Sequence, residues 1–176
     1  MKYQELNRPV LIDWLGLWTM RHKRPNADLL HEDIDIKNAL MDEGEQHILD
    51  VYLRGATQPT NLYFGLGNNG GTPGVPAETS TLSSITEVSG TSYARITVAC
   101  NSTDWPTLAL DSGDYRATSA TKTWTAGGTW TAADYLFLCN VSSGTSGKLI
   151  ATVALSASRV LLINDTLDVS MLVKLQ

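Results

Sequence analysis

The residues that could carry chemistry are few and widely spaced. The three histidines, His22, His31 and His47, show no HxH or HxxxH spacing, so no metal site is expected. The glycine-rich stretch from Gly65 to Gly71 lacks the Gly-Lys-Ser/Thr ending of a phosphate-binding loop. The chain has no Gly-x-Ser-x-Gly elbow, and its carboxylates are too scattered to nominate a catalytic pair. We therefore expect no catalytic residues, no cofactor and no enzymatic activity.

Three tryptophans offer a different kind of chemistry. Aromatic faces bind sugar rings, so Trp105, Trp124 and Trp130 are candidate surface aromatics for a glycan platform. The alternative is that they pack in the core or at a subunit interface.

The first 43 residues contain the candidate partner-binding residues. Trp14, Leu17 and Trp18 have the i, i+3, i+4 spacing that would place them on one face of a helix. That apolar patch must be buried, either on the chain's own β body or on another subunit.

A basic cluster follows the apolar patch. Arg21, Lys23 and Arg24 belong to it, and they suit either a solvated turn or an acidic groove on a partner. We predict that both groups bind a partner.

The surrounding elements are mostly short strands. One helix is expected over residues 42–54, where acidic residues begin the segment and Arg54 and Gly55 end it. Alternation and turn residues predict strands at 61–66, 85–88, 92–100, 115–124, 135–141, 148–155, 159–163 and 166–175. Residues 28–41 fit a strand or a helix. Eight short antiparallel strands predict a mainly β fold, a jelly-roll-like antiparallel β-sandwich with one short helix.

Composition limits the class of partner. The 176 residues carry a net charge of −5, which disfavours nucleic acid. Charged residues make up only 18%, below the roughly 25% that is usual in soluble domains, as expected for a surface covered by neighbours. The apolar run from Val10 to Met20 is too short to span a membrane and contains Asp13. The first residues do not resemble a signal peptide, so synthesis in a cytoplasm is expected.

Four blocks of sequence carry a family resemblance. They are GEQHILDVYLRG (44–55), NLYFGLGNN (61–69), TEVSGTSYARITV (86–98) and YLFLCNVSSGTSGKLIATVALSASRVLLINDTLDVSM (135–171). Their order resembles small β-sandwich virion structural proteins of tailed bacteriophages, of the capsid cement or decoration type. The resemblance covers residues 44–176 and leaves residues 1–43 as an extended N-terminal arm.

The resemblance implies a non-enzymatic component of the phage particle. The first expectation is a cement protein on the capsid exterior, a homotrimer that bridges subunits of the major capsid protein. The alternative is a head-fibre, tail or neck component that acts as a receptor- or glycan-binding module.

Overall fold

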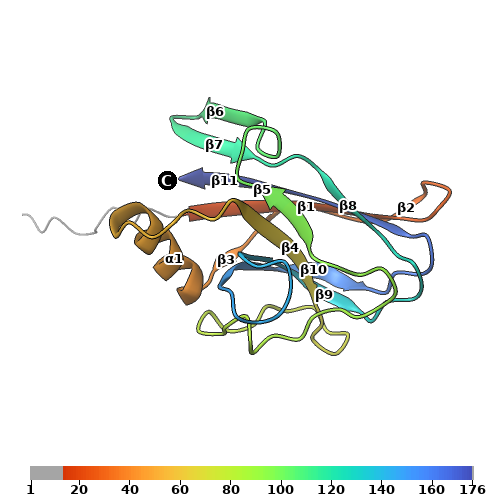
Figure 1. Ribbon diagram of the computed structural model, residues 1–176. Coiled ribbons are helices and arrows are strands. Elements are labelled where there is room, and N and C mark those ends of the chain that lie inside the picture. Colours follow the sequence, from red (N-terminus) through yellow and green to blue (C-terminus); the bar gives the residue numbers. More distant parts are fainter. Residues whose placement is uncertain (1–13, 176) are drawn as a thin grey trace, which may run out of the picture.

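The computed structural model describes residues 14–175, which form two antiparallel β-sheets packed face to face (Figure 1). The first sheet has the order β2-β1-β11-β7-β6, and β8 also pairs with β11. Its strands are β1 (Trp14–Lys23), β2 (Leu29–Lys37), β6 (Thr107–Asp111), β7 (Asp114–Thr118), β8 (Lys122–Thr125) and β11 (Thr166–Leu175). The second sheet has the order β3-β10-β9-β4-β5. Its strands are β3 (Ala39–Leu40), β4 (Asn61–Gly67), β5 (Ile96–Ala99), β9 (Ala133–Cys139) and β10 (Leu149–Arg159). The predicted fold class, a mainly β antiparallel sandwich with one short helix, is confirmed.

Strand β9 is buried along its whole length because both faces of the second sheet are covered. Leu136 and Leu138 belong to the core between the two sheets, which also contains Trp18 from the first sheet. The alternate residues of β9 face the other way and join a smaller cluster. That cluster contains Tyr135, Phe137, Cys139, Met41, Leu82 and Leu149. A strand buried on both faces reads as a continuous apolar run, which explains its clear sequence signal.

Two glycines in β4 make room for the aromatic side chains of β9. Gly65 lies opposite Phe137 and Gly67 opposite Tyr135 in the antiparallel register. A Cβ atom on Gly65 would lie 2.1 Å from the Phe137 ring, and one on Gly67 would lie 1.9 Å from the Tyr135 ring. The glycines of the NLYFGLG strand therefore let both rings lie flat across the neighbouring backbone.

The helix α1 (Asp42–Leu53) forms where it was predicted, between β3 and β4. Gly55 follows it at a φ of 75°, the left-handed conformation that ends many helices. Glu43 fixes the first turn, because its Oε2 accepts hydrogen bonds from the backbone N–H groups of Leu82 at 3.1 Å and Leu149 at 2.9 Å. Several of its apolar side chains face solvent: Tyr52 is 81% exposed, and Leu49 and Leu53 are also exposed.

Residues 14–40 form three strands of the two sheets, which corrects the expectation of an extended arm over these residues. Strand β1 lies between β2 and β11 and pairs with β11 along its whole length. Gly16, Trp18, Met20 and His22 are buried while the residues between them are partly exposed, the period of two that defines a strand. The helical spacing of the tryptophans was therefore a misleading signal. Residues 1–13 of the predicted arm lie outside the described residues.

Most other strand predictions are close to the observed elements. The expected strand at 115–124 is two strands, β7 and β8. The expected strand at 148–155 is part of one long strand, β10, that ends at Arg159, and residues 160–163 are not a strand, which corrects the prediction for 159–163. Residues 85–88 make only an isolated bridge between Glu87 and Gly67.

Cys100 and Cys139 are both free thiols. Helix α1 is too short and too polar to cross a membrane, and residues 14–175 contain no other candidate helix.

Candidate interaction surface

One end of the sandwich is built around the buried carboxylate of Asp165, in the turn between β10 and β11. Its Oδ2 accepts hydrogen bonds from Arg24 Nη1 at 3.1 Å and from the backbone N–H of Leu162 at 2.9 Å. His22 Nε2 lies 3.2 Å from the same oxygen. Asp165 therefore joins the β1–β2 hairpin to this turn, and both lie at the right-hand end of Figure 1.

Burial favours the neutral form of His22. Burial lowers the pKa of the imidazole, and the hydrogen bond and negative charge of Asp165 only partly oppose that effect. Nε2–H is then the donor to Asp165, and Nδ1 is an acceptor with no hydrogen-bond partner among the described residues. His31 on β2 stacks against the ring with centroids 5.9 Å apart.

A second buried pair links the two sheets at the same end. Asp33 on β2 accepts a hydrogen bond from Arg159 Nη2 at 2.7 Å, and both side chains are almost completely buried. Arg159 also donates to the Ala157 carbonyl at 2.7 Å and to Ser156 Oγ at 3.0 Å. The edge strand of the first sheet is thereby tied to the end of β10 in the second sheet.

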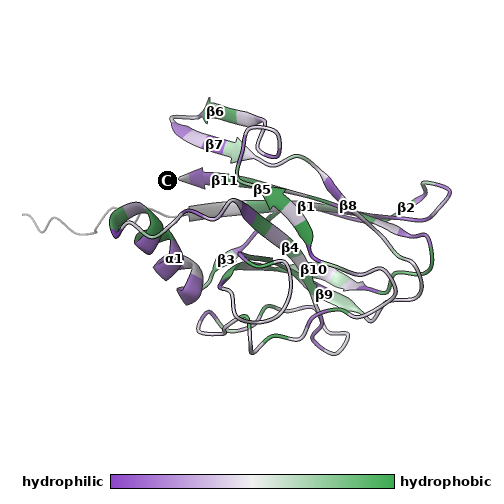
Figure 2. Ribbon diagram, in the orientation of Figure 1, coloured by the Kyte–Doolittle hydropathy of each residue, from purple (hydrophilic) through white to green (hydrophobic). Residues whose placement is uncertain are grey.

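Six exposed apolar side chains lie on β2, which carries Asp33, and on the turn before β11, which follows Arg159 and contains Asp165. We call them the apolar rim: Leu29, Leu30, Ile34, Val160, Leu162 and Ile163, between 37% and 60% exposed. The first three lie on β2, which is an edge strand and so leaves one side of its backbone unpaired. Figure 2 shows hydrophobic residues along the loop that leads into β11. The buried ionic contacts hold both halves of the rim in fixed positions, which suits a surface for protein contacts.

The predicted basic residues lie at this end, but each is paired within the chain. Arg21 contacts Glu32, Lys23 contacts Asp168 at 2.7 Å, and Arg24 contacts Asp165. They therefore do not form an unpaired basic patch that could bind an acidic groove on a partner. Leu17 is half-buried on the outer face of β1, and nothing is described of the Trp14 side chain.

Two of the three candidate surface tryptophans are core residues, which corrects the predicted platform. Trp124 is 3% exposed and donates from its indole N–H to the Ala94 carbonyl, and Trp130 is 2% exposed and donates to the Thr91 carbonyl. Trp105 is partly buried against the same core. Trp18 is fully buried in the chain's own sandwich, 4.9 Å from the Phe64 ring between centroids.

A shallow pocket lies elsewhere, lined in part by Glu87, Tyr93 and Arg95. Arg95 donates to both carboxylate oxygens of Glu87, at 3.0 and 2.9 Å, and to the carbonyls of Val141 and Gly144. Burial raises the pKa of Tyr93 well above its usual value, so its hydroxyl keeps its proton. These contacts hold the loop after β9 in place.

Within the described part of the chain, no three His, Cys, Asp or Glu side chains are grouped to hold a metal ion.

Sequence reasoning missed the residues that organise the interaction surface, namely Asp33, Arg159 and Asp165. The available signal was weak: Arg159 is a lone charge within a long apolar segment, and Asp165 lies in a predicted turn. Their partners are more than 100 residues away along the chain, so their pairing depends on the fold.

A family model matches most of the sandwich. Residues 39–172 match the family described as Podophage GP4 fiber I protein gp80. The chain belongs to this family. It is therefore a structural protein of the bacteriophage virion, as the resemblance in the sequence implied at that level. No curated protein matches the chain.

Proposed function

We propose that this protein is a structural subunit of a fiber on the phage virion, and that it acts through protein–protein contacts without catalysis. The family match supports the fiber position. A head-fibre, tail or neck component is the alternative expected from the sequence. This proposal keeps the fiber position and drops the glycan-binding platform. Trp124 and Trp130 are buried, so that platform does not support recognition of a glycan.

The subunits associate with one another through the apolar rim. Second copies of the chain are the proposed occupant because the rim adjoins the open edge of β2, where another strand can pair. Cyclic symmetry repeats one such contact between identical subunits, and a homotrimer is the expected product.

The oligomeric state of the full chain tests this proposal. Light scattering coupled to size-exclusion chromatography is expected to give a trimer for the unaltered protein. Leu162→Ser combined with Ile163→Ser should shift it toward monomers, because the rim loses two of its six apolar side chains. The matched control, Leu108→Ser combined with Leu110→Ser on the opposite end, should remain trimeric. A monomer at every concentration of unaltered protein would contradict self-association.

A capsid cement or decoration protein is the second candidate. The first sheet is open at both edges, β2 and β6, and both edges carry exposed leucines, an arrangement that suits repeated lateral contacts with a capsid lattice. Gold-labelled antibody imaged on purified virions separates the two candidates. Label on fibers supports the first proposal, and label distributed over the head supports the second.

A further inference from the structure

At the end opposite the apolar rim, the first sheet extends beyond the packed core. We call strands β6 and β7, residues 107–118, the ribbon. In the register, Val173 of β11 lies opposite Ala117 of β7, which lies opposite Leu108 of β6. Val173 packs against the core between the sheets. Residues paired across strands share a face, so the ribbon continues the inner face of the first sheet.

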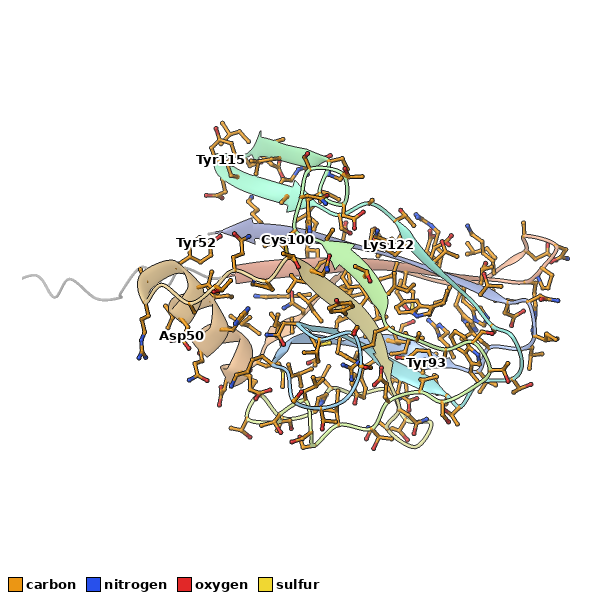
Figure 3. The ribbon with its side chains drawn as sticks, viewed as in Figure 1. Asp50, Tyr52, Tyr93, Cys100, Tyr115 and Lys122 are labelled. Atoms are coloured by element: carbon orange, nitrogen blue, oxygen red, sulfur yellow. The ribbon has the colours of Figure 1, made fainter. Side chains whose placement is uncertain are left out.

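This inner face of the ribbon is apolar and uncovered. Leu108, Leu110 and Tyr115 share it, and they are 73%, 63% and 62% exposed. The outer face is polar: Arg116 pairs with Asp111 at 3.2 Å, and Lys174 pairs with Asp114 at 3.4 Å. An amphipathic ribbon whose apolar side faces inward is expected to have something packed against that side. Figure 2 shows the hydrophobic residues of β6, and Figure 3 labels Tyr115.

The start of β1 lies close enough to supply the cover. Four residues lie side by side across the strands: Leu15 on β1, Lys174 on β11, Arg116 on β7 and Ala109 on β6. Each step is one strand spacing, so the start of β1 is about 10 Å from β7 and about 14 Å from β6. Residues 1–13 precede it, and extended chain covers about 3.3 Å per residue. Val10, four residues before Trp14, can therefore lie up to about 13 Å away, level with the ribbon.

We infer that residues 1–13 of the same chain dock on the inner face of the ribbon, with Val10, Leu11 and Ile12 against Leu108, Leu110 and Tyr115. These three residues are the longest uninterrupted aliphatic run in the segment, and only Asp13 separates them from β1. The docked segment completes the first sheet's buried face and protects the ribbon from local opening. This contact is independent of the apolar rim and of the proposed fiber position.

Photo-crosslinking in the full chain tests the contact directly. With p-benzoylphenylalanine in place of Leu11, irradiation should attach the segment to peptides from residues 107–118. A mixture of isotope-labelled and unlabelled chains identifies the origin of each adduct. Adducts whose two peptides carry the same label are expected. Adducts that join two labels would assign the ribbon to a second copy, and the absence of adducts on 107–118 would leave the segment elsewhere; either result overturns the inference.

Hydrogen exchange gives a second readout. Val10→Ser, Leu11→Ser and Ile12→Ser together should raise amide exchange in residues 107–118 by on the order of tenfold, while β9 is unchanged. The control, Leu162→Ser with Ile163→Ser, removes apolar side chains at the other end and should leave the ribbon's exchange as it was. Equal exchange of the ribbon in both variants would also overturn the inference.

Discussion

At the scale of single residues, buried polar groups determine how this protein responds to pH. His22 lies beside Asp165 and His31, with the charges of Arg24 and Arg159 in the same cluster. Burial lowers its pKa in the folded state, so between that lowered value and about 6.5 the unfolded chain binds more protons. Stability should therefore rise with pH through this window and fall as the solution is acidified below about pH 6.5.

The variant His22→Gln removes this titration while keeping a hydrogen-bond donor for Asp165. Its Tm should depend less on pH than that of the unaltered protein between about pH 5.5 and 7.5, where most carboxylates stay ionised. His47→Gln on α1 is the matched control and should keep the original slope. Parallel Tm curves for His22→Gln and the unaltered protein would show that His22 does not cause the dependence.

At the scale of elements, one carboxylate connects helix α1 to the rest of the sandwich. Glu43 satisfies the N–H groups of Leu82 and Leu149, whose side chains are both buried. Glu43→Ala should lower the free energy of unfolding by about 2–4 kcal/mol, because two backbone donors lose their acceptor.

Denaturant unfolding measures this loss, and faster amide exchange at Leu82 and Leu149 locates it. Glu45→Ala, an exposed acidic residue in the same helical turn, is the control and should change stability by less than about 1 kcal/mol. A loss of similar size in both variants would assign the effect to the helix itself.

Sequence patterns identified the elements whose environment is simple. Strand β9 is buried on both faces and α1 has a clear start and stop, so both were found near their true positions. Strand β1 was missed because Trp14, Leu17 and Trp18 also satisfy a helical spacing. Only pairing with β11 over its whole length selects the strand.

At the scale of the whole molecule, the pair formed by Asp33 and Arg159 holds the two sheets together at the end that carries the apolar rim. Asp33→Asn leaves the buried guanidinium without its charged partner, so we expect a loss of about 3 kcal/mol in the free energy of unfolding. The double variant Asp33→Leu with Arg159→Met should recover most of that loss, since it removes both charges.

The exposed neighbouring pair provides the comparison. Glu32→Gln removes the negative charge that pairs with Arg21 and should cost less than about 1 kcal/mol, because water solvates both partners. Urea unfolding of all three variants gives the values. A double variant that is no more stable than Asp33→Asn would show that the charges themselves are not the source of the loss.

The sequence by itself determined the mainly β class, the position of α1 and the membership in a group of phage virion proteins. These features depend on local periodicity, turn residues and short blocks of sequence, all of which are visible in the order of residues alone. The tertiary structure decided that Trp18, Trp124 and Trp130 are core residues and that the basic cluster is neutralised by Glu32, Asp165 and Asp168. It also decided which apolar side chains stay exposed. Burial and charge pairing depend on strands that meet from distant parts of the chain, and no local pattern contains that register.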